Sequence, residues 1–502
     1  MKKNTLFNGA LALAVGGILA KILSAVYRIL LTRILGGEGI GLYQLIFPVY
    51  SLCVVLSTAG LPMAISKVVA KCEGNEKIVV KKSMVLTAIV SILIFTCLIV
   101  FSGGLATLQG DKNLKLCYII LAPTIILVGG ISVLKGYFQG KNNFVPSAVS
   151  GIVEQFVKLF VGLILSLAFI KYGVLQAVIG AVVAIILSEV ASFVVLLVYL
   201  SKHPPQNLGG NVVLVKNMIK DILPITLTNI VLPLATFIDS LLVVNLLSIN
   251  FSKQTSVFLF GLESGAVSSL VSLPTIFSFA IASVILPAMS TRVHKFNKNQ
   301  NLTLAVKIVL MICVPCVVLF LITPERLLVL LYGNKLNGFG IDGINVARRL
   351  LAISGLGLLF LAVNQLLSSC LNAIELRFVT VRNLCLAIVV KFVLEILFLP
   401  SKMLNIYALA ASNTICYALV AVLNWFEIRK CLSININFSF WRGLILSNSF
   451  MVLTLLAVMS FGGGVANSLL AFVVSAITYL VCLWLFKILE KKDMATFRYK
   501  IN

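Results

Sequence analysis

Long apolar segments recur along almost the whole chain, and they constrain its fold more than any other feature. Polar or Pro/Gly-containing breaks separate fourteen stretches of 18 or more mainly apolar residues. A helix needs about 20 such residues to cross a bilayer core, where its backbone polar groups must bond within the segment. The sequence therefore predicts an all-α integral membrane protein with about 14 transmembrane helices. They lie near residues 9–33, 41–66, 84–108, 114–138, 147–170, 174–200, 222–247, 262–290, 302–323, 348–373, 379–400, 404–426, 443–461 and 465–488.

The composition agrees with a membrane protein and excludes a soluble globule. Of the 502 residues, 60% are hydrophobic and 11% are charged, whereas about 25% are charged in a soluble domain. The net charge of +24 could suggest a nucleic-acid partner, but the Lys and Arg residues form short clusters between apolar segments, without interleaved aromatic residues. We therefore expect these clusters to contact anionic membrane lipids, and we expect no nucleic acid.

The distribution of basic residues predicts the topology. If the N-terminus lies inside, the inner segments carry more than twice as many Lys and Arg residues as the outer loops. Both termini are therefore expected in the cytoplasm. Lys2 and Lys3 followed by an apolar run resemble a signal peptide, but the run continues past Lys21, so we treat it as the first membrane helix.

Two parts of the chain repeat one another. Residues 61–67 (LPMAISK), at the end of the second predicted helix, parallel residues 286–292 (LPAMSTR), at the end of the eighth. Six helices therefore occur twice in the same orientation, which predicts two pseudo-symmetric lobes. The expected parts are an N-terminal lobe (1–205), a C-terminal lobe (206–430), and two further helices with a cytoplasmic tail (431–502).

Lys21 and Arg28 lie inside the first predicted membrane helix. They share one helix face with Gly17 and Ser24, because the four residues are spaced by four, three and four, while residues such as Leu19 remain for lipid and packing. An unpaired charge at mid-membrane costs from about 3 to more than 10 kcal/mol. We therefore predict that this face lines a water-filled cavity that receives an anionic headgroup.

Two further pairs of opposite charge lie within predicted membrane helices. Glu154 and Lys158 are four residues apart, and Lys391 and Glu395 repeat the spacing with the charges reversed. Each pair could be a neutralised pair that locks helices together, or it could face a cavity. We favour the cavity because Lys158 and Lys391 occupy equivalent positions of the repeat. Glu189 stands alone on its predicted helix and carries a weaker functional expectation.

Polar residues on two other predicted helices allow more than one interpretation. Asp239 shares a helix face with Asn229 and could meet Arg28, bind a coupling proton or cation, or form an internal polar contact. Asn364 and Gln365 begin a polar stripe that suits hydrogen bonds between helices as well as it suits a sugar-binding surface. We expect both groups to line the transport cavity.

The chain carries no sign of catalysis. Its two histidines lie in separate polar loops, and its eleven cysteines follow no repeating pattern. It contains neither a Walker A sequence nor a soluble domain for nucleotide hydrolysis. We therefore expect no enzyme activity, no cofactor and no metal, and the energy for transport must come from an ion gradient, the membrane potential or the substrate gradient.

The first 160 residues carry a set of short motifs. They are Lys21, Tyr27-Arg28, Leu35-Gly36, Glu38, Gly41-Leu42-Tyr43-Gln44, Gly60-Leu61-Pro62, Ser66-Lys67, Gly136-Tyr137-Phe138-Gln139-Gly140, Pro146, and Glu154-Gln155 with Lys158. These motifs resemble the stage V sporulation protein B group of polysaccharide transporters. That group belongs to the multidrug/oligosaccharidyl-lipid/polysaccharide (MOP) exporter superfamily and is related to the lipid II flippases. The second half of the chain departs further from the pattern.

The resemblance implies a MATE/MOP-like flippase in a bacterial cytoplasmic membrane. Such a protein would move an undecaprenyl-pyrophosphate-linked saccharide, for example a peptidoglycan precursor such as lipid II for the spore cortex, by alternating access. Its substrate-binding residues would be Lys21, Arg28, Lys158, Lys391, Glu154 and Gln155. The resemblance also fits an H+ or Na+ coupling ion and a monomeric protein.

The sequence is also compatible with two other functions. The same scaffold could serve a multidrug/cation antiporter, although cationic drugs require carboxylates and aromatic groups, whereas the first lobe presents mainly cations. A membrane scaffold without transport activity is the other alternative, but it leaves the intramembrane charges unexplained.

Overall fold

The computed structural model describes residues 2–58, 60–71, 75–206, 222, 225–290 and 295–488. These residues form helices and turns without a strand, so the predicted all-α class is confirmed. The helices of the first half are α1 (Lys2–Thr58), α2 (Leu61–Lys71), α3 (Glu76–Leu108), α4 (Leu114–Gly140), α5 (Val145–Phe169), η1 (Ile170–Tyr172), α6 (Val174–Lys202), α8 (Val231–Leu247), α9 (Lys253–Phe260) and the π-helix η2 (Gly261–Val267). Those of the second half are α10 (Ser268–Ser290), α11 (Lys295–Ile322), α12 (Pro324–Tyr332), η3 (Gly333–Leu336), α13 (Gly343–Ala373), α14 (Arg377–Phe398), α15 (Ile406–Cys431), α16 (Phe438–Met459) and α17 (Val465–Leu485).

The membrane helices agree with the predicted segments. Within the described ranges, 11 helices are long and apolar enough to cross a bilayer. One of them contains two predicted segments, because α1 is interrupted at Gly36, whose φ of 69° and ψ of −172° lie outside the helical region. Two more predicted segments coincide with α14 and with α8, a shorter apolar helix of 17 residues. In the segment 222–247, residues 223 and 224 lie outside the described residues.

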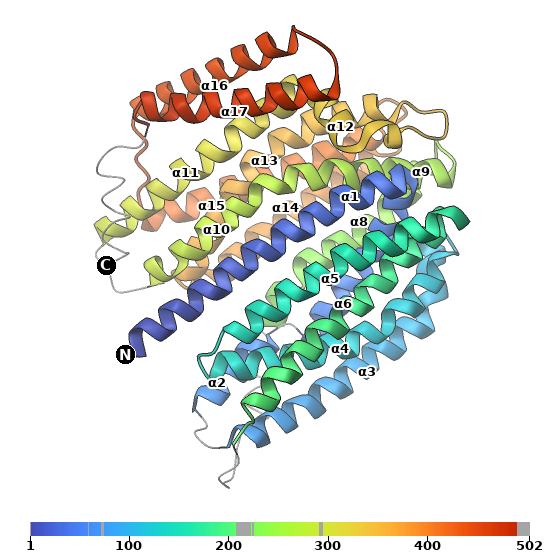
Figure 1. The fold of residues 1–502 in the computed structure, drawn as a ribbon, viewed down its shortest axis with the longest axis vertical. Coiled ribbons are helices and arrows are strands. Elements are labelled where there is room, and N and C mark those ends of the chain that lie inside the picture. The colour runs from blue at the N-terminus through green and yellow to red at the C-terminus, as the bar shows by residue number, and fades with distance from the viewer. Residues whose placement is uncertain are drawn as a thin grey trace. The chain divides into compact units, whose positions relative to one another are not determined.

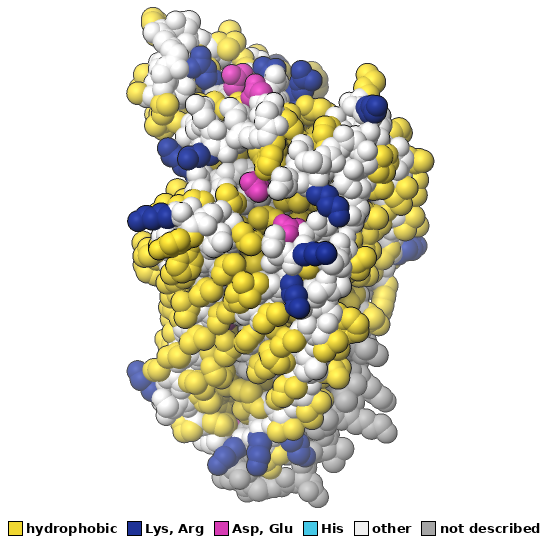
Figure 2. Space-filling model, turned by 90° about the vertical axis from the view of Figure 1, so that its right-hand side faces the viewer, with side chains coloured by type: hydrophobic (Ala, Val, Ile, Leu, Met, Phe, Trp, Pro, Cys, Tyr) yellow, Lys and Arg dark blue, Asp and Glu magenta, His cyan; other side chains and the backbone are white. Residues whose placement is uncertain are grey.

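The surface of the molecule suits a lipid environment. Hydrophobic side chains cover broad areas of the face drawn in Figure 2, where Lys and Arg side chains outnumber Asp and Glu. Leu93 on α3 is 65% exposed and Leu453 on α16 is 62% exposed. Large apolar side chains exposed in such numbers indicate contact with lipid rather than with water.

The chain divides into two compact units, Met1–Ala266 and Val267–Asn502. In unit 1, α5 packs along α6 and along the first half of α1, while α3 packs along α4, as the ribbon in Figure 1 shows. Helices α8 and α9 belong to unit 1. The lobes expected at 1–205 and 206–430, and their pseudo-symmetry, stay predictions.

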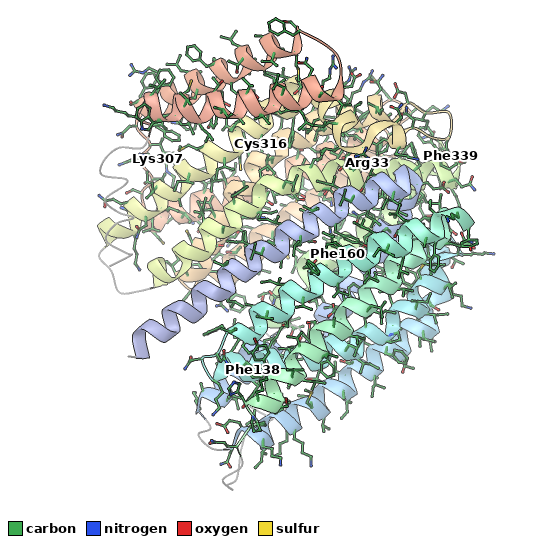
Figure 3. All side chains as sticks on the ribbon, in the orientation of Figure 1. Arg33, Phe138, Phe160, Lys307, Cys316 and Phe339 are labelled. Atoms are coloured by element: carbon green, nitrogen blue, oxygen red, sulfur yellow. The ribbon has the colours of Figure 1, made fainter. Side chains whose placement is uncertain are left out.

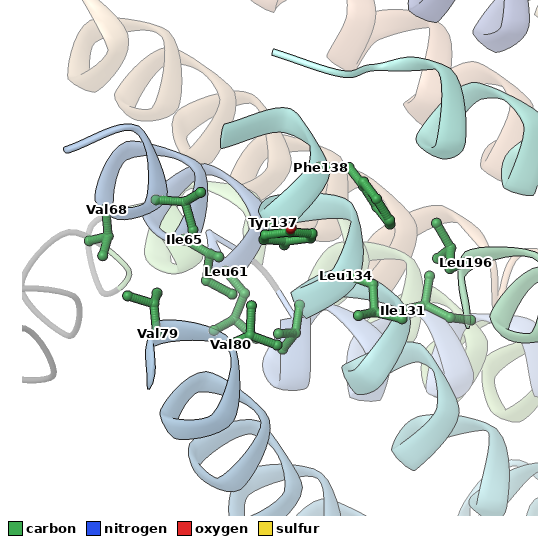
Figure 4. Close-up of a cluster of buried hydrophobic side chains, with 12 residues drawn as sticks. Leu61, Ile65, Val68, Val79, Val80, Ile131, Leu134, Tyr137, Phe138 and Leu196 are labelled. Carbon is green, nitrogen blue, oxygen red and sulfur yellow. The ribbon is translucent and has the colours of Figure 1, made fainter. Parts of the chain in front are cut away.

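A cluster of buried hydrophobic side chains fixes α2, α3, α4 and α6 to one another within unit 1 (Figure 4). Ile65 of α2, Leu134 of α4 and Leu196 of α6 are fully excluded from solvent at 0% exposure. Tyr137 of α4 donates a hydrogen bond to the backbone carbonyl of His203, 3.2 Å away, just beyond α6. This cluster makes one end of α4 and α6 a rigid support for the rest of unit 1.

A buried glutamine holds α8 against α1 and the α3–α4 connection. Gln109, at 0% exposure, donates hydrogen bonds to the Leu45 carbonyl of α1 (2.9 Å) and to Ser240 Oγ of α8 (2.8 Å). The Tyr118 hydroxyl of α4 donates to Gln109 Oε1. The nitrogen and the oxygen of the Gln109 side-chain amide thus both form hydrogen bonds inside the unit, as a buried polar group requires.

Unit 2 is organised around α13, which packs on α10, α11, α12 and α15. The two last helices lie side by side, and α16 packs on α11 (Figure 1). A hydrogen bond of 2.7 Å from the Tyr479 hydroxyl of α17 to the Met311 carbonyl also joins α17 to α11. Cys313 and Cys316 lie in this same helix α11, and both are free thiols. Figure 3 labels Cys316. The C-x-x-C spacing of the two cysteines therefore falls inside a membrane helix.

Candidate functional site in unit 1

One side of α1 carries polar residues, and the other carries exposed apolar residues. Lys21, Ser24 and Arg28 are half-buried, whereas Leu19 is 45% exposed and Ile22 is 41% exposed. The helical period thus separates a lipid-facing side from a polar side. The polar side faces the interior of unit 1 at Ser24, which lines a cavity.

The cavity has a volume of ≈ 280 Å³ and lies between α1, α5 and α6. This volume is close to the lower end of small-ligand sites, about 300 Å³, so it suits one charged group with its neighbours rather than a whole lipid headgroup. Its lining combines Ser24, Phe47, Tyr50, Ser51, Val54, Glu154, Gln155, Lys158, Ile185, Ser188 and Glu189.

Arg28 and Lys158 both lie close to the ring of Phe47. The Arg28 guanidinium carbon lies 5.6 Å from the centroid of the Phe47 ring, and Lys158 Nζ lies 5.5 Å from the same centroid. Lys158 Nζ also lies 5.8 Å from the Tyr27 ring. Cation–π contacts of this kind hold a cation within the membrane while leaving its N–H groups able to donate to an anion.

The approach of α5 to α1 positions Lys158. Gly162, one turn beyond Lys158, faces the Tyr27 ring, and a Cβ at this glycine would lie 2.7 Å from Tyr27 Cε2. The absence of a side chain at Gly162 therefore lets the two helices pack closely. As a result, the Lys158 ammonium reaches the aromatic rings of α1.

The cavity lining also contains two carboxylates, Glu154 and Glu189. Glu189 of α6 is only 7% exposed, and its Oε1 accepts a hydrogen bond of 3.1 Å from the Tyr50 hydroxyl. Glu154 Oε1 accepts a hydrogen bond of 2.8 Å from Gln155 Nε2. The spacing of Glu154 and Lys158 allowed a pair within α5, but each side chain has the different neighbours described here.

Phe47, Tyr50 and Ser188 were not predicted as site residues. Aromatic and serine side chains in an apolar helix give no signal of their own, because they are equally common in helix contacts. Glu189 differs from these three residues, because a lone carboxylate in an apolar segment indicates a function. The structure shows that Glu189 lines the cavity.

The candidate residues of unit 2 form buried contacts. Lys391 is 6% exposed and Glu395 is 0% exposed, and Lys391 Nζ lies 3.6 Å from Glu395 Oε1. Ser412 of α15 donates a hydrogen bond of 3.1 Å to the same Glu395 oxygen. This is the geometry of a neutralised pair that joins α14 to α15. A role of Lys391 and Glu395 in the transport cavity stays a prediction.

The polar stripe of α13 takes part in hydrogen bonds between helices. Asn364 Oδ1 accepts from Asn424 Nδ2 of α15 at 2.8 Å, and Asn424 Oδ1 in turn accepts from Asn383 Nδ2 of α14 at 2.9 Å. This observation fits the hydrogen-bonding interpretation of the stripe. The neighbouring Gln365 is half-buried on α13, and a sugar contact at either residue stays a prediction.

Among the predicted residues of unit 1, Lys21 and Arg28 on α1 and Asp239 and Asn229 in or near α8 do not line the cavity. Asp239 is half-buried on α8, and Asn229 is exposed just before that helix begins. Their coupling roles stay predictions. Among the described residues, no group of three or more His, Cys, Asp and Glu side chains is arranged to hold a metal ion.

Comparison with known proteins shows which family the chain belongs to. The family described as "Polysaccharide biosynthesis protein" matches residues 6–293, which is more than half of the chain. The chain belongs to this family. The predicted resemblance to the stage V sporulation protein B group and the MOP superfamily is also confirmed, as the following relatives show.

One relative and two solved structures cover most of the chain. Stage V sporulation protein B of Bacillus subtilis (strain 168) is 26% identical over 98% of both chains. A structure of the lipid II flippase MurJ in an inward closed conformation has a TM-score of 0.71 at 17% identity, covering 93% of this chain and 98% of that one. An inward-facing MATE multidrug transporter of the MOP superfamily has a TM-score of 0.63 at 14% identity, covering 84% of this chain and 97% of that one. This polysaccharide biosynthesis family member therefore has the fold of a membrane transporter.

Proposed function

We propose that the protein moves an undecaprenyl-pyrophosphate-linked saccharide, such as a peptidoglycan precursor, from the inner to the outer leaflet of a bacterial cytoplasmic membrane. Support comes from its family, from its similarity to stage V sporulation protein B over 98% of the chain, and from its likeness in fold to MurJ. A role in spore cortex formation, with both termini in the cytoplasm, belongs to the same proposal.

The observation that carries the proposal is the pair of cations at the Phe47 ring. Arg28 and Lys158 come from two different helices and lie within the membrane-spanning part of unit 1. A pyrophosphate bears about two negative charges at neutral pH and offers several acceptor oxygens, for which guanidinium and ammonium groups are strong charged donors. The site therefore matches the anionic link between the lipid and its saccharide.

Transport then follows the alternating-access scheme. Lys21, Arg28 and Lys158 hold the pyrophosphate while Glu154 and Gln155 accept or donate hydrogen bonds at the adjoining sugar. The lipid tail stays in the bilayer, so only the headgroup crosses through the protein. An interior-negative potential of 100 mV favours outward movement of two negative charges by up to about 4.6 kcal/mol, at about 2.3 kcal/mol per charge.

A multidrug/cation antiporter is the second candidate, because a MATE transporter shares the fold. Glu189 and Glu154 give the cavity two carboxylates that a cationic ligand could use. The two functions differ in the sign of the charge that the site binds. A binding experiment with ligands of both charges therefore distinguishes them.

The experiment uses a photoreactive undecaprenyl-pyrophosphate saccharide with purified protein in detergent. We expect cross-linked peptides from α1 and α5 around Arg28 and Lys158. The double substitution Arg28→Ala/Lys158→Ala should reduce the cross-linking at least tenfold, because it removes both charged donors. Lys171→Ala, which removes an exposed cation of η1 in the same unit, is the matched control and should cross-link normally.

Two outcomes would contradict the proposal. Cross-linking of the double variant at the level of the unchanged protein would show that the anion binds elsewhere. Labelling of the same peptides by a photoreactive cationic dye, with none by the lipid probe, would favour the antiporter.

A further inference from the structure

Glu189 presents a difficulty for any anion that enters the cavity of unit 1. Glu189 of α6 is only 7% exposed, and it lines the same cavity as Lys158. A buried negative charge beside the site repels an incoming anion strongly, because the interior screens charges far less than water does. The charge on Glu189 therefore decides how well Lys158 can hold a pyrophosphate.

The charged groups around Glu189 come from every helix that packs on it. Tyr50 of α1 donates to it, Lys135 of α4 and Lys158 of α5 act on it as cations, and Glu154 of α5 acts on it as a second anion. With both glutamates ionised, Lys135, Lys158 and the Arg28 guanidinium at the Phe47 ring oppose two carboxylates, which leaves one net positive charge. A pyrophosphate with about two negative charges then makes the site net negative.

We propose that Glu189 takes up a proton from water as the anionic headgroup enters the unit 1 cavity, so that the site binds the anion and one proton together. The proton goes to the carboxyl oxygen that does not accept from Tyr50. This inference rests on the proposed function and adds the proton as a second ligand of the same site.

The hydrogen bond from Tyr50 suits both states of Glu189. The Tyr50 hydroxyl lies 3.1 Å from Oε1, which accepts strongly as a carboxylate oxygen and more weakly as the carbonyl oxygen of a neutral acid. The protonated Oε2 then gains an O–H group that can donate to a phosphate oxygen. A group that repels the anion when ionised thus becomes a donor to it when neutral.

Glu154 is less suited to this role. Its Oε1 accepts a hydrogen bond of 2.8 Å from the Gln155 amide, and the side chain is half-buried rather than buried. Glu154 therefore serves as the matched carboxylate for comparison.

The test measures the affinity of purified full-length protein for an undecaprenyl-pyrophosphate saccharide across a range of pH. If one proton binds with each anion, affinity falls about tenfold per pH unit above the point where Glu189 loses its proton in the unliganded protein. Glu189→Gln imitates the neutral acid, so its affinity should lack this slope and should exceed that of the unchanged protein at high pH. Titration of the probe's own phosphates is common to all variants and cancels in the comparison.

Two more variants keep the proposal falsifiable if Glu189→Gln folds poorly. Glu154→Gln should retain the slope. Tyr50→Phe removes a donor to the ionised carboxylate and should move the fall in affinity to higher pH, because the neutral acid becomes easier to form.

Different results would contradict proton uptake at Glu189 and the proposed function. A Glu189→Gln protein that keeps the slope, a Glu154→Gln protein that loses it, or a Tyr50→Phe protein with an unchanged profile would overturn proton uptake at Glu189. Failure of the unchanged protein to bind the lipid probe at any pH would instead contradict the proposed function, and this inference with it.

Discussion

At the scale of single residues, the Lys391–Glu395 pair shows how buried charges depend on one another. Glu395 is 0% exposed, with Lys391 Nζ at 3.6 Å and Ser412 as a donor. Removing one member of such a pair leaves an uncompensated buried charge, at a cost of about 3–5 kcal/mol, whereas replacing both with apolar groups is often neutral. The stability of variants at this pair therefore reveals whether its role is structural.

We expect Lys391→Met to lower the melting temperature of the detergent-solubilised protein markedly. The double substitution Lys391→Met/Glu395→Leu should restore most of the loss, because it removes the charge that the single change exposes. Lys402→Met, at an exposed lysine of the same unit, is the control and should melt normally. A double variant as unstable as the single one would show that the charges themselves are needed.

The same residues show what sequence spacing can predict. Glu154/Lys158 and Lys391/Glu395 have the same spacing, which correctly indicates that each pair lies on one helix face. The spacing cannot predict the neighbours that other helices supply. Ser412 of α15 donates a hydrogen bond to Glu395, whereas the aromatic rings of α1 lie beside Lys158.

At the scale of helices, α1 packs on α9 with almost no space between their backbones. A Cβ at Gly41 would lie 2.2 Å from the Val257 carbonyl oxygen of α9. Such a contact cannot be relieved by rotating a side chain, because the obstructing atom belongs to a backbone. The approach of these helices therefore requires glycine at position 41.

We expect Gly41→Ala to destabilise the protein by about 1–3 kcal/mol or more, since overpacking forces backbone shifts. Thermal unfolding in detergent measures this effect. Gly17→Ala on the same helix is the matched control, because no described heavy atom lies within 4 Å of the added Cβ, and it should leave stability unchanged or slightly raised. Equal melting temperatures for the two variants would contradict the backbone contact.

The sequence predicted the positions of the membrane helices better than the way in which consecutive helices connect. Apolar length alone located the membrane segments, including the interruption of α1 near residue 36. The sequence did not predict that helical structure continues from α9 through the π-helix η2 into α10, because residues 253–260 are less apolar and no local residue pattern distinguishes a π-helix. Helix ends depend on tertiary neighbours, such as the Gln44 side chain of α1, which donates to the Ser264 carbonyl of η2 at 2.8 Å.

At the scale of the whole molecule, we propose that the protein carries the anionic headgroup of a lipid-linked saccharide across the membrane. The family, the fold and the cations of unit 1 all support it. The direction of transport should respond to voltage, because a net negative headgroup moves outward more easily when the inside is negative. A proton bound at Glu189 would reduce, but not abolish, the charge that moves.

The most direct test is transport in reconstituted vesicles. Protein oriented with its termini inside is supplied with a fluorescent undecaprenyl-pyrophosphate saccharide in the inner leaflet, and its appearance in the outer leaflet is followed while a potassium diffusion potential is imposed. The account predicts protein-dependent movement that accelerates when the vesicle interior is negative and is lost in Arg28→Ala/Lys158→Ala. Lipid that stays in the inner leaflet while a cationic dye crosses the same membranes would contradict it.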